Sequence, residues 1–232
     1  MNRFLRVESC DYKAEPIRAL RDAEADRRAG RYRGALEKHI WFHECAEQAD
    51  RGLVGVRLSF ALAEWYQLGL AFPPAMDALI ESRDRAETAY KYDLLQVDGF
   101  RDAAAINRAL GCIERTAELF RFVAESDPSK ASKVYLFAEA ALIATGEYKL
   151  CGDFLNYRPI LDAITFVSPW EAAEKTMPPG GLYLLRNTVA LLVINHRCAE
   201  AWAVAREADS RLPGQRIFEL LASALEGQLP SL

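Results

Sequence analysis

The chain has 232 residues, of which 51% are hydrophobic and 27% are charged, and its formal net charge is −4. This balance is typical of a folded globular protein and excludes a disordered or fibrous chain. The negative net charge provides no general attraction to nucleic acid or to an anionic membrane, so we expect neither of them as a partner.

The cysteines and the apolar runs predict the compartment. The five cysteines are scattered, and no Cys-x-x-Cys pair occurs, so we expect no disulfide framework. The first residues lack the apolar stretch of a secretory signal. The longest apolar run, Val189 to Ile194, is far shorter than the ~20 residues that span a bilayer. The sequence therefore predicts a cytoplasmic protein.

Apolar residues recur at three- and four-residue steps from residue 17 to residue 225, and runs of β-branched residues are almost absent. This period predicts helices and no strand. We expect the first helix to start at Pro16 and to end before Gly30, and the second to follow at once and to end at residues 50–52. A third helix, over about 54–68, is apolar nearly all round, so we expect it to be buried and to end at Gly69.

The pattern continues with five expected helices, which begin after Pro73 and Pro74 and cover about 76–90, 100–110, 115–124, 130–144 and 148–157. Prolines and glycines then interrupt it, which predicts a junction over residues 158–181. Three more helices are expected at about 182–195, 199–210 and 217–226. The predicted organisation is a helical-hairpin region over 1–157, the junction, and C-terminal helices over 182–232 that either continue the hairpins or form a separate bundle.

Glycines mark a repeat in the first part of the chain. Gly30, Gly69, Gly111 and Gly146 each stand between two expected helices, at separations of about 39, 42 and 35 residues. These separations are within the period range of helical-hairpin arrays. One hairpin cannot bury its apolar face alone, so we expect the hairpins to stack.

Two segments resemble the turn of a tetratricopeptide repeat. They are Gly30-x-Tyr32-x-x-Ala35-Leu36 and Gly146-Glu147-Tyr148-x-x-Cys151, and Leu110-Gly111 and Asp127-Pro128 are similar to other landmarks of that family. The resemblance covers roughly residues 16–157. It implies an all-α superhelix of stacked antiparallel hairpins whose concave surface binds peptides or partner proteins.

The sequence contains no recognisable catalytic or cofactor motif. His39 and His43 are one helical turn apart, with Glu44, Cys45 and Glu47 nearby, a spacing that suits a metal ion. Both histidines share stripes with apolar residues, however, which favours packed imidazoles. Motifs of phosphate loops, dinucleotide-binding turns and serine nucleophiles are absent. We therefore expect no metal, no other cofactor and no catalysis.

Three residues leave alternatives open. Arg57 and Glu64 are seven positions apart in an expected apolar helix, too far along its axis to pair directly. Each of them either pairs with a neighbour from another helix or faces a ligand groove. Trp41 lies on an otherwise polar stripe, so it either packs on the next hairpin or is an exposed anchor for a partner.

The function that these features favour is a non-catalytic adaptor or scaffold that binds another protein or a peptide. In arrays of the tetratricopeptide family the first helix of each hairpin lines the concave side. The resemblance therefore implies a peptide-binding set rich in cationic and amide donors, selective for acidic ligands: Arg57, Tyr66, Asn107, Arg108 and Lys133. The alternative is an enzyme or ligand sensor with a small-molecule pocket at the junction between the repeats and the C-terminal helices.

Overall fold

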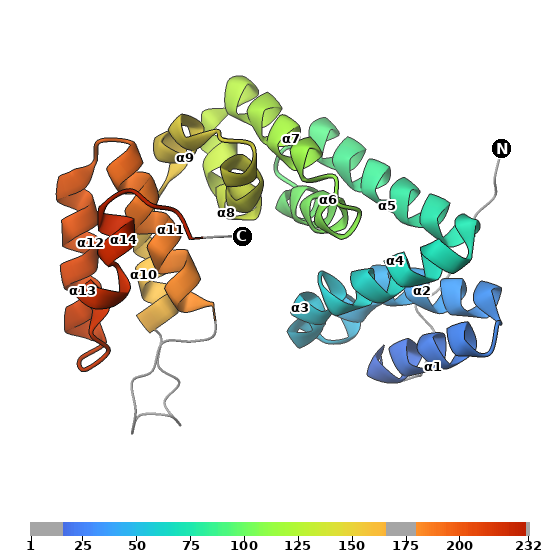
Figure 1. Cartoon of the computed structure of the whole chain (residues 1–232). Helices are drawn as coiled ribbons and strands as arrows, with labels where there is room; N and C mark the ends of the chain where they lie inside the picture. Colours follow the sequence, from blue (N-terminus) through green and yellow to red (C-terminus); the bar gives the residue numbers. More distant parts are fainter. Residues whose placement is uncertain (1–15, 166–179, 231–232) are drawn as a thin grey trace. The chain divides into compact units, whose positions relative to one another are not determined.

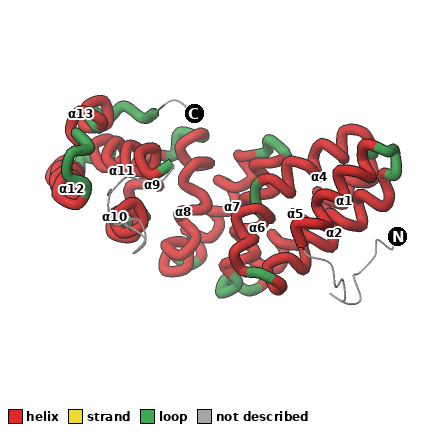
Figure 2. The backbone as a smooth tube through the Cα atoms, turned by 90° about the horizontal axis from the view of Figure 1, so that it is seen from below, coloured by secondary structure: helices red, strands yellow, loops and turns green. Residues whose placement is uncertain are grey.

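The computed structural model describes residues 16–165 and 180–230, and within these ranges the chain is helical, with no strand (Figures 1 and 2). The elements up to residue 126 are α1 (Pro16–Arg28), α2 (Tyr32–Ala49), the 3-10 turn η1 (Arg51–Leu53), α3 (Val54–Arg57), α4 (Phe60–Ala71), α5 (Pro73–Tyr92), α6 (Val97–Ala109) and α7 (Ile113–Ser126). They are followed by α8 (Pro128–Ala144), α9 (Tyr148–Phe154), α10 (Tyr157–Thr165), α11 (Gly181–Ile194), α12 (Cys198–Arg211), α13 (Ile217–Leu220) and α14 (Ala222–Leu225). The predicted all-α fold is confirmed.

Consecutive helices pack in pairs, namely α1 with α2, α4 with α5, α6 with α7, and α11 with α12. The second helix of one pair also contacts the first helix of the next, as α2 does with α4 and α5 does with α6. This arrangement is the one expected for stacked helical hairpins.

The same turn joins the two helices of four pairs, namely α1–α2, α6–α7, α8–α9 and α11–α12. Gly30, Gly111, Gly146 and His196 all have a left-handed φ, between 60° and 75°. After each of them, the next N–H bonds to the carbonyl five residues earlier, at 2.8 Å in every case. This is the Schellman motif, which stops a helix by bonding its last free carbonyls. His196 has this conformation without being a glycine, so the glycine pattern of the sequence missed the fourth turn.

Gly69 is not a helix breaker, so this part of the repeat prediction is wrong. It lies inside α4, and a Cβ at this position would meet the Cα and Cβ of Met76 at 3.2 Å. The glycine therefore allows α4 and α5 to approach closely. Phe72 provides the turn, and Pro73 and Pro74 start α5.

The helix expected over residues 54–68 is also corrected, because it is two helices. Ser59, with φ −132° and ψ −86°, separates α3 from α4. The expected burial holds for one face only: Leu62, Trp65 and Leu68 are buried, whereas Phe60 on the other face is exposed. Arg57 and Glu64 therefore do not share a helix.

The chain forms two compact units, which divide inside α8 between Ala141 and Leu142. In the first unit, buried aromatic rings of successive helices meet edge to face. Tyr90 of α5 contacts Phe100 of α6 at 5.3 Å, Phe100 contacts Phe120 of α7 at 6.4 Å, and Phe120 contacts Tyr135 of α8 at 6.1 Å. Such pairs add to the apolar burial that holds the stack together.

In the second unit α11 is central, with Leu185, Val189 and Leu192 buried against its neighbours. Asn195 at its end donates to the carbonyl of Tyr148 at 2.8 Å. Helix α10 occupies the first part of the predicted junction at 158–181, whereas residues 166–179 lie outside the described residues. The predicted boundary therefore stays a prediction. No helix of the described part is both long and apolar enough to cross a membrane.

Candidate functional site

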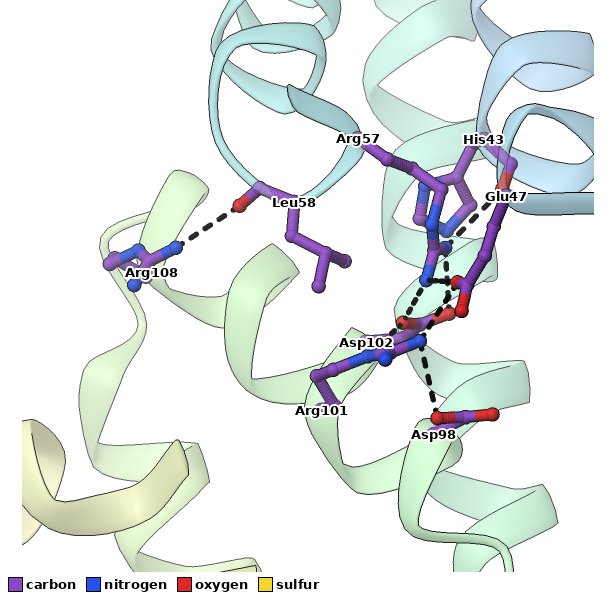
Figure 3. Close-up of polar contacts among 8 residues, drawn as sticks. All are labelled: His43, Glu47, Arg57, Leu58, Asp98, Arg101, Asp102 and Arg108. Atoms are coloured by element: carbon purple, nitrogen blue, oxygen red, sulfur yellow. Dashed lines mark hydrogen bonds and ion pairs between the residues drawn. The ribbon is translucent and has the colours of Figure 1, made fainter. Parts of the chain in front are cut away.

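Arg57, at the end of α3, is held by a carboxylate pair (Figure 3). Its guanidinium donates to both carboxylate oxygens of Asp102 on α6, at 2.9 and 2.6 Å, and to Glu47 of α2 at 3.1 Å. Only 4% of Arg57 is exposed. Burial opposes the charge, but the two carboxylates outweigh this effect and raise the pKa of Arg57 further. Arg57 is therefore paired inside the fold, with neighbours from the second helix and from α6.

Arg101 extends the pair into a network. It bonds to Glu47 at 2.9 Å and lies 3.2 Å from Asp98 and 3.7 Å from Asp102 (Figure 3). Two arginines and three carboxylates thus connect α2, α3 and α6. Because Glu47 is on α2 and Arg101 is on α6, the network connects the first hairpin directly to the third.

A polar groove of about 630 Å³ lies over this network, between α2, α5 and α6. Its lining includes four arginines and four carboxylates: Arg51, Arg57, Arg85, Arg101, Glu44, Glu47, Asp98 and Asp102. Most of these charges already pair with one another. The groove therefore has no excess of either charge to attract an ion.

Glu64 has a separate environment, beside Glu24 of α1. Burial and the neighbouring Glu24 carboxylate raise the pKa of Glu64. Glu24 itself accepts hydrogen bonds from Arg27 at 2.7 and 2.8 Å and from Arg28 at 2.7 Å, and mainly the Arg27 bonds lower its pKa to about 2. Glu64 therefore belongs to the packing of α1 on α4.

The two histidines of α2 pack against one tryptophan. The ring of His39 stacks on Trp65 at 6.1 Å, and that of His43 meets the same indole edge to face at 5.9 Å. Burial lowers the pKa of each imidazole to about 4, so both are neutral at pH 7. The packed interpretation of the histidines is confirmed. Among the described residues, no group of three or more His, Cys, Asp or Glu side chains is arranged to hold a metal ion.

Trp41 is buried, not exposed. It packs in a cluster with Leu20 of α1, Phe42 of α2 and Ala61 of α4. Of the two alternatives for Trp41, packing between hairpins is confirmed.

A second hollow, of about 190 Å³, also borders Arg101 and is mostly apolar. It is lined by Leu58, by α6, by Ile113 and Thr116 of α7, and by the part of α8 before Leu142. Leu136 and Phe137 of α8 are adjacent large apolar side chains that are 53% and 40% exposed. They form a wall that no other described element covers completely.

Arg108 lies at this hollow and is exposed. One of its Nη atoms donates to the carbonyl of Leu58 at 3.1 Å (Figure 3). That carbonyl is at the break between α3 and α4. In the described part of the chain Arg108 has no carboxylate partner, so its remaining donors are free to bind one.

The structure does not bring the five predicted peptide-binding residues onto one surface. Arg57 lines the polar groove, and Arg108 lines the apolar hollow. Asn107 is fully buried and donates to Thr116 at 3.2 Å. Tyr66 is half-buried against the core, and Lys133 is exposed on α8 outside both linings. Only Arg108 has a position suited to the predicted role, and that role stays a prediction.

Sequence reasoning missed Leu136 and Phe137. The signal was present, because Val134 to Ala138 form an unbroken apolar run in a helix that needs only one buried stripe. Val134, Tyr135 and Ala138 form that stripe and are buried. The two remaining residues of the run therefore had to be exposed or to cover a hollow.

Comparisons with protein-family models, with curated proteins and with solved structures give no match to the chain. The likeness to tetratricopeptide repeats therefore rests on the turn residues and on the packing of successive hairpins alone.

Proposed function

We propose that the chain is a non-catalytic binding module that holds a segment of a partner protein over the apolar hollow between α6 and α8. The observation that carries this proposal is an exposed arginine without a carboxylate partner beside two exposed large apolar side chains. Arg108 provides the cation, and Leu136 and Phe137 provide the apolar wall.

These contacts suit a segment with a large apolar side chain close to a carboxylate. Burying a leucine or phenylalanine side chain contributes about 1.5–3 kcal/mol. A hydrogen bond from Arg108 to a carboxylate contributes about as much. The hollow, at about 190 Å³, has room for roughly one such side chain. Further affinity has to come from the adjacent helix surfaces.

The test uses fluorescent peptides of one length that contain Leu or Phe next to Asp or Glu, with Asn and Gln versions as controls. We expect the acidic peptides to bind in fluorescence anisotropy, and Arg108→Ala and Leu136→Ala each to weaken binding about tenfold. Matched controls are Arg33→Ala and Leu70→Ala, which remove an exposed arginine and an exposed leucine elsewhere. Equal binding of acidic and amide peptides, or equal losses in the controls, would contradict the proposal.

The compartment is part of the same proposal. None of the four cysteines of the described residues forms a disulfide, which supports a reducing compartment such as the cytosol. The alternative function, a small-molecule pocket at the predicted junction, involves residues outside the described ranges and stays a prediction.

A further inference from the structure

The outer face of α5 is a second surface of different chemistry. Helix α5 has 20 residues and packs against α4 and α6 with the side that carries Ala75, Leu79, Arg83 and Tyr90 (Figure 1). The residues of the opposite side recur at three- and four-residue steps: Asp77, Glu81, Asp84, Thr88 and Tyr92. All five are exposed. Over about 22 Å, at 1.5 Å per residue, this stripe faces away from the core.

A shallow hollow runs along this side. Its volume is about 740 Å³, and its lining is formed by α5 residues and by Gln96 of the following turn. The apolar part comes from Ile80, Ala89 and the ring of Tyr92, which is 94% exposed. A nearly fully exposed tyrosine is a side chain that gains much by being covered.

The charges at the hollow are mainly negative. Asp77 and Glu81 have no ion pair in the described structure. Asp84 is shared between Arg83 at 2.8 Å and Arg115 at 3.3 Å. Arg85 is the one cation of the lining, and Glu44 of α2 lies 3.4 Å from it. The stripe therefore keeps two uncompensated carboxylates beside apolar side chains.

We infer that this α5 stripe, defined by Asp77, Glu81, Asp84, Thr88 and Tyr92, is a docking surface for a basic amphipathic helix of a partner protein. Lysines or arginines one turn apart on the partner match Asp77 and Glu81, which are themselves one turn apart. Apolar side chains of the same helix cover Tyr92 and Ile80. A second copy of the chain is a poorer occupant, because two copies of this acidic face repel each other and the chain has a net charge of −4.

The stripe and the hollow beside Arg108 prefer ligands of opposite charge, so the two sites can be tested independently. The probe is a designed 18-residue helical peptide with lysines at i and i+4 and leucines beside them on the same side of the helix. A second peptide with glutamate in place of each lysine is its control. Binding is measured by fluorescence anisotropy on the full chain, and the footprint by hydrogen exchange of the α5 amides.

We expect the lysine peptide to bind, to protect residues 77–92, and to bind more weakly as salt is added. Asp77→Asn with Glu81→Gln should weaken binding about fivefold, and Tyr92→Ala about tenfold. The control double variant Glu37→Gln with Glu125→Gln removes the same charge from exposed positions on α2 and α7. It should change the affinity less than about twofold. Equal losses in both double variants, protection elsewhere, or a Kd weaker than about 1 mM would each overturn the inference.

Discussion

The two ends of α6 differ in whether their charges are used by the fold. Near its start, Asp102 and Arg101 belong to a buried network with Arg57 and Glu47. Near its end, Arg108 has only a carbonyl as its partner and lies beside exposed apolar side chains. One helix thus carries charges that hold the hairpins together and a charge that remains available for a ligand. The comparison teaches that an arginine in a helical array is evidence for a ligand site only when the structure shows that no carboxylate of the fold already pairs with it.

The largest loss of stability is expected from Asp102→Asn, which removes a carboxylate of the buried network. This change leaves Arg57 buried with Glu47 as its one remaining carboxylate at 3.1 Å. We expect the free energy of unfolding to fall by about 3 kcal/mol, because an underpaired buried charge is costly. Urea unfolding followed by circular dichroism measures it. Asp98→Asn is the control, since Asp98 is exposed and pairs loosely with Arg101; it should cost less than about 1 kcal/mol. Equal losses of stability in the two variants would mean that the pairing of Arg57 with Asp102 does not cause the loss.

Acid should lower the free energy of unfolding through the two histidines of α2. His39 and His43 have a pKa of about 4 in the folded protein, below their ordinary value of 6.5. Their contribution to stability is complete above pH 6.5 and is lost as the pH falls toward 4. Between pH 7 and pH 5 we expect a loss of about 2 kcal/mol for each histidine. Urea unfolding at several pH values measures this loss.

A variant and two carboxyl groups sharpen this pH test. His39→Phe keeps a ring against Trp65 and should remove one half of the pH effect; an unchanged slope would contradict the assignment. Glu24, with a pKa of about 2, loses its contribution only below about pH 4.5. Glu64, whose pKa is raised, has the opposite sign, since it contributes at low pH and loses that contribution as the pH rises through its folded pKa.

A smaller difference in the free energy of unfolding is expected between variants of two adjacent residues of α6. Asn107 is fully buried and bonds to Thr116, whereas Arg108 is exposed. Asn107→Ala leaves the Thr116 hydroxyl without this partner, and we expect it to lower the free energy of unfolding by about 1–3 kcal/mol. Arg108→Ala should change it by less than about 0.5 kcal/mol. Thermal unfolding of both variants under one set of conditions decides whether the two neighbours differ.

The smallest effect on stability is expected at the wall of the hollow. Leu136→Ala removes a side chain that is already half exposed, so the free energy of unfolding should change by less than about 1 kcal/mol. Val134→Ala, two residues before Leu136 in the same helix and fully buried, should cost about 1–3 kcal/mol. If Leu136→Ala were the more damaging change, the wall would be part of the core and not a binding surface.

Much of the fold follows from local patterns in the sequence. The period of apolar residues predicts α5, α6, α7, α8, α11 and α12 to within a few residues, because each helix buries one stripe. Gly30, Gly111 and Gly146 mark turns because a left-handed φ suits glycine. Gly69 does not mark a turn, because it lies inside α4 and is needed there for the close approach of Met76. The turn at His196 escapes the glycine pattern, because a residue other than glycine takes the left-handed conformation there.

The sequence by itself determined the helices and most of their turns, because these depend on residues within one or two helical turns. It also indicated that the two histidines of α2 are packed, but their partner Trp65 of α4 is known only from the tertiary structure. Tertiary structure alone decided which charges pair in the buried network of α2, α3 and α6. Arg57 meets Asp102 across 45 positions of the chain, and Arg101 meets Glu47 across 54. The local period of apolar residues cannot predict such pairs, because they depend on how the hairpins stack. The same stacking left Arg108, Leu136 and Phe137 uncovered.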